Sequence, residues 1–146
     1  MANSATTLHP NIETTISPEF PKSPSGFGRG VWLSMHVLAI DSINDMSINF
    51  FMGWVNKMLY RLPCSKCVKH ATDYLSTHPM EPYREYINED GVRNGMFIWS
   101  WTFHNDVNKR LGKTLVTFED AYNMYLPTYN DPNSVEDDDG VCELRR

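Results

Sequence analysis

Apolar side chains recur at helical spacing in the middle of the chain. After Asp45, seven of them form a single stripe, at Ile48, Phe51, Met52, Val55, Met58, Leu59 and Leu62. A repeat of three to four residues predicts an amphipathic helix with one buried face. We expect Asp45 to cap this helix and Pro63 to end it.

Helical patterns also appear before and after this segment. The first starts near Arg29 and carries an apolar face of Trp32, Met35, Leu38 and Ala39. A third helix is expected from Cys64 to about Thr77, with Pro79 preventing its extension. The segment 80–94 is polar and contains Pro and Gly residues, so we expect a long loop with at most a turn of helix.

Two helices are expected in the last part of the folded chain. One begins near Gly95 and ends at Gly112, which can supply a left-handed cap. The other is short, begins at Thr117 with Asp120 completing an N-terminal box, and is closed by Pro127. No strand pattern longer than two residues is present. The sequence therefore predicts an all-α protein, a four-helix bundle with a short fifth helix.

The 146 residues provide room for one folded domain. Residues 1–28 are rich in Ser, Thr and Pro without an apolar period and are expected to form a flexible N-terminal arm. Residues 29–127 hold the helical patterns and form the domain. Residues 128–146 are acidic and offer almost nothing to bury, so we expect a flexible tail.

Composition and charge exclude several classes of protein. The net charge is -5, and residues 29–129 hold ten basic and ten acidic residues, so nucleic acid is not an expected partner. No apolar run approaches the ~20 residues that a membrane-spanning helix needs, and no secretory signal is present. Three cysteines are too few, and odd in number, for a small disulfide-stapled fold.

The segment Cys64-Ser65-Lys66-Cys67 is a C-x-x-C motif at the expected start of a helix. The helix dipole and the free amides at that place stabilise a thiolate, so redox reactivity is expected. The same cysteines could instead be half of a zinc site, with His70 as third ligand and a fourth from His36, His78 or His104. Two ordinary core cysteines are the remaining interpretation.

Two further groups combine chemistry with helical spacing. Trp32 and His36 lie four residues apart and therefore share a helical face, which taken alone is more typical of packing than of ligand binding. His104, Asn105 and Asn108 are poor helix formers placed in the middle of a helix, a local conflict typical of a functional site. With Lys113 one turn later, these donors suit an anionic or heteroaromatic ligand, although a polar solvent face is the alternative.

Taken together, these motifs resemble those of the Erv/ALR family of FAD-linked sulfhydryl oxidases. The shared pattern runs through Gly28-Arg29-x-x-Trp32-x-x-x-His36, Cys64-x-x-Cys67-x-x-His70, Trp99 and His104-Asn105-x-Val107-Asn108-x-x-Leu111-x-Lys113. It covers the chain from about residue 28 to about residue 125. No G-x-G-x-x-G or Walker pattern supports a different nucleotide site.

The resemblance implies a helical bundle that holds FAD beside a redox-active Cys64–Cys67 pair. It implies that these two cysteines are catalytic, and that FAD is bound by Arg29, Trp32, His36, His70, Trp99, His104, Asn105, Val107, Asn108, Leu111 and Lys113. By the same resemblance, Cys64 receives the substrate thiolate and Cys67 passes electrons to FAD. Oxygen then accepts them and hydrogen peroxide is released.

The resemblance also implies partners and a source. The partners are thiol-containing proteins, a thioredoxin-like or small dithiol relay protein among them, together with oxygen and a second copy of the chain. Because extra structural cysteines and a thioredoxin-like domain are missing, the chain looks like the minimal form found in large cytoplasmic DNA viruses. Host cytoplasm or virion is then the expected location, ahead of the mitochondrial intermembrane space. A small residue, Ala71, also replaces the aromatic residue that commonly follows His70.

Two alternatives to this interpretation remain at the level of sequence. The first is a non-catalytic, zinc-binding helical interaction module, and the second is a purely structural helical adaptor. The lone Cys142 in the acidic tail is open in the same way. It is either a free surface thiol or an auxiliary shuttle or intersubunit link, and we expect it to be dispensable because a single thiol cannot carry a disulfide onward.

Overall fold

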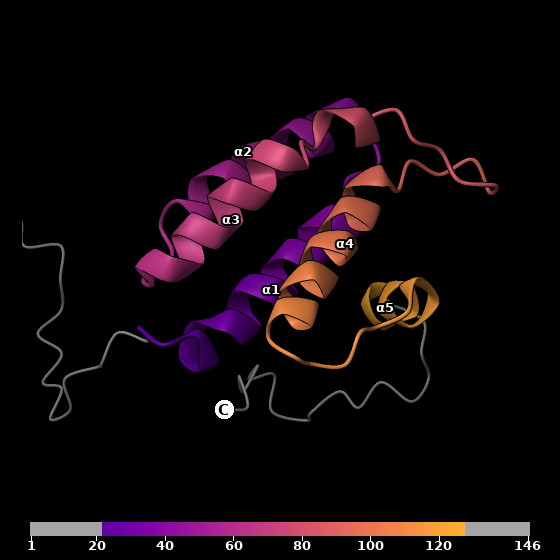
Figure 1. Ribbon diagram of the computed structural model, residues 1–146. Helices are drawn as coiled ribbons and strands as arrows, with labels where there is room; N and C mark the ends of the chain where they lie inside the picture. Colours follow the sequence, from indigo (N-terminus) through magenta and orange to yellow (C-terminus); the bar gives the residue numbers. More distant parts are fainter. Residues whose placement is uncertain (1–21, 128–146) are drawn as a thin grey trace, which may run out of the picture.

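The computed structural model describes residues 22–127 and shows five α-helices and one 3₁₀ turn (Figure 1). The elements are α1 (Pro24–Ile40), α2 (Asp45–Leu59), α3 (Ser65–Thr77), η1 (Glu81–Tyr83), α4 (Gly95–Arg110) and α5 (Phe118–Tyr125). Within the described residues the extended structure is limited to an isolated bridge between Ile87 and Arg93. The predicted all-α architecture with a short fifth helix is confirmed.

The helices form two pairs around a shared core. Helices α1 and α4 run side by side in opposite directions, α2 and α3 form the second pair, and α5 packs against α1 and α4 (Figure 1). The core is built from the apolar faces of all five helices, and its fully enclosed side chains include Met35, Ile48, Phe51, Val55, Phe97 and Trp99. The ring of Trp99 contacts three aromatic neighbours, from α2, α3 and α4, at Phe51, Tyr74 and Phe103.

Helix α1 begins earlier than the sequence pattern predicted. The apolar pattern predicts a start near Arg29 and an arm over residues 1–28, but residues 24–28 are helical. The Ser23 hydroxyl accepts a hydrogen bond from the Gly26 amide at 3.3 Å, and Pro24 occupies the first turn. Serine followed by proline is a common helix start. The glycines after it are poor helix formers, so the sequence pattern does not indicate a helix there.

Helix α2 is capped by Asn44, so the expected cap at Asp45 was wrong by one residue. The Asn44 side chain accepts from the Ser47 amide at 3.0 Å, and the Ser47 hydroxyl accepts from the Asn44 amide at 3.1 Å. This reciprocal pair of hydrogen bonds is a capping box. It forms at Asn44 because a capping box joins the N-cap to the residue three positions later, which is Ser47. The helix also ends at Leu59 rather than at Leu62, because Pro63 restricts the backbone of Leu62 and has no N–H to donate to the Leu59 carbonyl.

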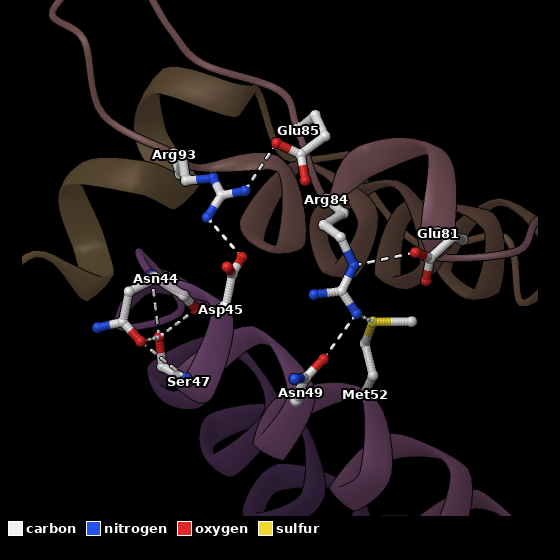
Figure 2. Close-up of polar contacts among 9 residues, drawn as sticks. All are labelled: Asn44, Asp45, Ser47, Asn49, Met52, Glu81, Arg84, Glu85 and Arg93. Carbon is white, nitrogen blue, oxygen red and sulfur yellow. Dashed lines mark hydrogen bonds and ion pairs between the residues drawn. The ribbon is translucent and has the colours of Figure 1, made fainter.

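The loop 80–94 is held against the start of α2 by charged side chains (Figure 2). Arg93 contacts Asp45 and Glu85, both at 2.8 Å, and thereby joins the loop to the first turn of α2. Arg84 pairs with Glu81 at 2.9 Å and donates to Asn49 of α2 at 2.7 Å. Both arginines of the loop are therefore paired with nearby carboxylates, and these contacts hold the segment that leads into α4.

No helix within residues 22–127 is long and apolar enough to cross a membrane. The acidic tail and most of the arm lie outside the described residues, so the proposed division of the chain stays a prediction apart from the earlier start of α1.

Candidate redox and cofactor site

Cys64 and Cys67 form a disulfide at the start of α3, with 5.2 Å between their Cα atoms. Cys64 is the N-cap of the helix, and its Sγ accepts a hydrogen bond from the Cys67 amide at 3.2 Å. Both cysteines are half-buried, so the bridge is open to solvent on one side. An amide aimed at Sγ, together with the positive end of the helix dipole, stabilises negative charge on this sulfur when the bridge is reduced.

A second group of functional side chains lies between α1 and α4. His36 is 2% exposed and donates or accepts at both ring nitrogens: Nδ1 lies 3.1 Å from the Ser100 hydroxyl, and Nε2 lies 2.9 Å from Nδ1 of His104. Ser100 donates its single hydroxyl proton to the carbonyl of Phe97 at 2.9 Å. Its oxygen therefore accepts from His36, which makes His36 Nε2 an acceptor and leaves His104 Nε2 without a proton.

Aromatic rings enclose this histidine pair. The Trp32 ring stacks on His104 with centroids 3.9 Å apart and planes 2° apart. The rings of Phe97 and Tyr125 lie 5.7 Å and 4.8 Å from His36. We call Trp32, His36, Phe97, His104 and Tyr125 the histidine–aromatic cluster; it draws on α1, α4 and α5, three segments far apart in the sequence.

Burial keeps both histidines neutral near pH 7. It lowers the pKa of His36 from 6.5 to about 4, with His104 adding to the effect. The pKa of His104 is also lowered to about 4, mainly by burial and in addition by the positive charge of Lys113. Burial raises the pKa of Tyr125, so its hydroxyl stays protonated. The cluster therefore offers flat, uncharged surfaces and neutral hydrogen-bonding groups.

Asn105 uses its amide to fix the connection between α4 and α5. Its Nδ2 donates to the Val116 carbonyl at 2.7 Å, and its Oδ1 accepts from the Val116 amide at 3.0 Å. The Trp101 indole donates to the same carbonyl at 2.8 Å. The structure thus gives Asn105 a role in positioning the polypeptide next to the cluster.

The end of α4 places Lys113 beside the cluster. Gly112 has a φ of +67°, and its amide donates to the Lys109 carbonyl, while the Lys113 amide donates to the Asn108 carbonyl at 2.8 Å. This is a Schellman motif, which needs glycine at the left-handed position and confirms the predicted cap. Asn108 is buried, and its side chain has only a long 3.5 Å contact to Asn105, whereas Leu111 is exposed at the cap.

The other predicted site residues are distributed more widely. Val107 is half-buried against the core, and Arg29 is exposed on α1 three residues before Trp32. Trp99 is fully buried and donates its indole N–H to the His78 carbonyl at 2.8 Å, which is the setting of a packing residue. His70 is exposed on α3, three residues after Cys67. Cys142 lies outside the described residues.

Three residues that contact His36 were not identified from the sequence. Ser100, Phe97 and Tyr125 contact His36, yet none belongs to a motif in the sequence. Helical spacing offered one clue, because Phe97, Ser100 and His104 stand three and four residues apart and so share a face of α4.

The chemistry of this donor set fits FAD. Flat rings and neutral imidazoles suit a planar heteroaromatic ring system, and Arg29 and Lys113 supply cations for a diphosphate. A metal has less support, because within residues 22–127 no three His, Cys, Asp or Glu side chains gather as a metal ion would require. The zinc set considered from the sequence is therefore not assembled in the described part of the chain.

Comparison with known proteins agrees with this chemistry. The FAD-linked sulfhydryl oxidases of two isolates of African swine fever virus are 30% and 29% identical over 102 residues, which cover 68% of this chain and 79% of each relative. The crystal structure of the yeast Erv1 core superimposes with a TM-score of 0.60 at 18% identity, covering 84% of this chain and 97% of that one. This structure shows the similarity of fold.

The family model described as Erv1 / Alr family matches residues 29–126, which span the disulfide, the histidine–aromatic cluster and all of the predicted site residues. The resemblance inferred from the motifs is confirmed, and the chain belongs to the Erv1/Alr family.

Proposed function

We propose that this protein is an FAD-linked sulfhydryl oxidase, an enzyme that oxidises protein dithiols to disulfides and delivers the electrons to oxygen. The observation that carries the proposal is the Cys64–Cys67 disulfide at the first turn of α3, in a chain whose relatives are named FAD-linked sulfhydryl oxidases. The net reaction takes a dithiol and one oxygen molecule to a disulfide and one hydrogen peroxide.

The thiol chemistry follows from the position of the two sulfurs. A substrate thiolate attacks Sγ of Cys64, forms a mixed disulfide and releases Cys67 as a thiolate. The second substrate thiol then attacks the substrate sulfur of the mixed disulfide and releases Cys64 as a thiolate. The Cys67 amide lies 3.2 Å from Sγ of Cys64 and stabilises this departing thiolate. Two substrate thiols have become a disulfide, and the enzyme holds the electron pair as a dithiol.

FAD, when bound, supplies acceptance of that electron pair and its transfer to oxygen. We propose that Trp32, His36 and His104 line its site, and that Asn108, Lys113 and Arg29 hold its polar parts. Asn105 fixes the neighbouring backbone through Val116. His70, Val107 and Leu111 remain predicted contacts, and Trp99 is proposed to support the site from the core.

Exposed apolar side chains on α1 and on α2 support a homodimer. Leu33 and Val37 on α1 are 53% and 41% exposed, and Met46 and Phe50 on α2 are 80% and 61% exposed. In each helix the two residues are four apart and therefore share a face of that helix. Large apolar side chains exposed in pairs are candidates for burial against a partner, and a second copy is the proposed partner. Sedimentation should show a dimer that Phe50→Glu disrupts, and a wild-type monomer would contradict this assignment.

The viral relatives support action in the cytoplasm of a virus-infected host cell or in the virion. Substrates would then be viral or host proteins with reduced dithiols, including thioredoxin-like or small relay proteins. Immunolocalisation in infected cells tests this placement, and confinement of the protein to mitochondria would contradict it.

The enzyme assignment is tested by the absorbance spectrum and turnover of purified protein. We expect a flavin spectrum that persists through desalting, and oxygen consumption with peroxide release on addition of dithiothreitol. A colourless protein with stoichiometric zinc would favour the zinc-binding module instead.

A further inference from the structure

The chain around the disulfide is strongly cationic. Residues 57–70 contain four basic residues and no acidic one, whereas the remainder of the described chain has more acidic than basic residues. We call these four residues the cationic corner: Lys57, Arg61, Lys66 and Lys69. Lys57 lies in the last turn of α2, Arg61 in the turn after it, and Lys66 between the two cysteines.

The cationic corner is exposed, and most of its charge has no partner within the described residues. All four side chains reach solvent. Lys69 alone pairs with a carboxylate, Asp73, and both members are more than half exposed, so this pair is weak in water. In the loop 80–94, by contrast, Arg84 and Arg93 are each paired with neighbouring carboxylates (Figure 2).

Unpaired cations beside a reactive disulfide act on the approaching substrate. They attract acidic segments over several ångströms and raise the rate of encounter. This attraction requires no shaped pocket, which suits an enzyme that must reach cysteines on a folded partner.

We propose that the cationic corner selects dithiol substrates whose cysteines are flanked by acidic residues. The proposal rests on the sulfhydryl oxidase function and names the substrate class for the same disulfide. The exchange itself is unchanged: the substrate loses two electrons and two protons, and the Cys64–Cys67 bridge becomes a dithiol.

The test compares three synthetic peptides with the same Cys-x-x-Cys centre and acidic, neutral or basic flanks. Dithiothreitol, which has no charge, serves as the reference substrate for the full-length holoenzyme. At low ionic strength, kcat/KM should be at least about tenfold higher for the acidic than for the basic peptide. Added salt should shrink this ratio, because the charges lie at the surface.

Charge variants then locate the effect. Arg61→Glu with Lys69→Glu should lower the preference for the acidic peptide at least about tenfold and leave dithiothreitol turnover close to wild type. Arg61→Gln with Lys69→Gln should have an intermediate effect, and it disturbs folding less than the two Glu substitutions because it introduces no negative charge. Ile43→Glu with Ile87→Glu changes the net charge as much as the Gln pair does, at exposed sites near the start of α2, the opposite end of that helix from the corner, and should preserve the preference.

The outcomes separate this inference from the enzyme assignment. Wild-type protein that does not turn over dithiothreitol contradicts the oxidase function itself. Normal dithiothreitol turnover with equal kcat/KM for the three peptides overturns the inference alone. Equal loss of preference in the corner and control variants would also overturn it, because the effect would then belong to net charge.

Discussion

The Cys64–Cys67 disulfide and the histidine–aromatic cluster are built in opposite ways. Cys64 and Cys67 are three residues apart, half-buried and flanked in the sequence by basic residues, and their geometry comes from a single helix turn. His36 and His104 are 68 residues apart, uncharged and enclosed by three helices. The first region needs little more than the start of α3, whereas the second exists only when α1, α4 and α5 have packed.

This difference assigns separate tasks to the two regions. A local, exposed disulfide can meet many partners and can be reduced without disturbing the fold. A buried cluster assembled from distant segments can hold a flat cofactor in one position, because the same packing that forms the fold fixes its rings. Mutations of the disulfide should therefore change activity more than stability, and mutations in the histidine–aromatic cluster should change both.

The largest expected effect is the loss of activity in Cys67→Ser. Thiol oxidation should fall by at least about a thousandfold, because no intramolecular disulfide remains to accept the substrate electrons. The bridge closes a loop of about four residues, so removing it should cost at most about 2 kcal/mol of stability. Oxygen consumption and thermal unfolding measure the two effects, with Ser65→Ala as control. Normal turnover by Cys67→Ser would remove the disulfide from the mechanism.

Next in size is the loss of cofactor in His104→Ala. This variant removes the ring that stacks on Trp32 and contacts His36, so FAD occupancy should fall by at least about tenfold. Holoprotein should consequently lose its thermal advantage over apoprotein, since a ligand stabilises only the state that binds it. The flavin-to-protein absorbance ratio after desalting measures occupancy. Full occupancy in both His104→Ala and Asn108→Ala would show that this cluster is not the FAD site.

Acid should weaken the cluster region through its two buried histidines. Their pKa values fall from 6.5 when the chain is unfolded to about 4 in the fold, so between these values the unfolded state binds more protons. Their contribution to stability is complete above about pH 6.5 and is lost as the pH falls towards 4. The free energy of unfolding of apoprotein should therefore drop by a few kcal/mol across that window.

The control for this acid effect is Ser65→Ala, which removes no titratable group. Urea unfolding of Ser65→Ala should show the same fall between about pH 7 and about pH 4.5 as wild type. The double variant His36→Gln with His104→Gln should show a clearly smaller fall. An unchanged pH dependence in the double variant would mean that other groups control acid stability.

The smallest expected effect comes from Ser100, whose hydroxyl sets the proton positions of the histidine pair. Ser100→Ala leaves Nδ1 of His36 buried without a partner, which should cost about 1–3 kcal/mol. Nitrogen NMR of the imidazoles should show the proton on Nδ1 of both histidines in wild type and a mixture of forms in the variant. Ser100→Thr keeps the hydroxyl and should restore the wild-type pattern. Protons on Nε2 in wild type would contradict the assigned donors and acceptors in the hydrogen bonds that link His104, His36 and Ser100.

Local sequence was sufficient for most of the fold. The helix at 64–77, the start of α4 at Gly95, the left-handed Gly112 and the Thr117 cap each depend on neighbouring residues, and all are confirmed. The wrong prediction for the cap of α2 also has a local cause, because two neighbouring residues could serve as the cap. Asn44 and Asp45 are both good caps, and only the Ser47 side chain decides between them.

The site was less accessible to sequence reasoning because its contacts connect distant segments. Motif spacing singled out His36 and His104, but their hydrogen bond follows from the antiparallel packing of α1 and α4. Ser100 was missed because a serine inside a helix is unremarkable until a histidine faces it. Asn105 was expected to contact the cofactor, and no local pattern could show that its amide holds Val116.

The proposed electron route enters at the Cys64–Cys67 bridge and leaves through FAD, and one measurement tests it most directly. Anaerobic dithiothreitol should bleach the flavin absorbance of the purified wild-type holoprotein within seconds, and readmitted oxygen should restore it with release of peroxide. The flavin absorbance of Cys67→Ser holoprotein should stay unchanged under the same conditions. Equal bleaching of both proteins would contradict the account, because electrons would then reach the flavin without passing through the bridge.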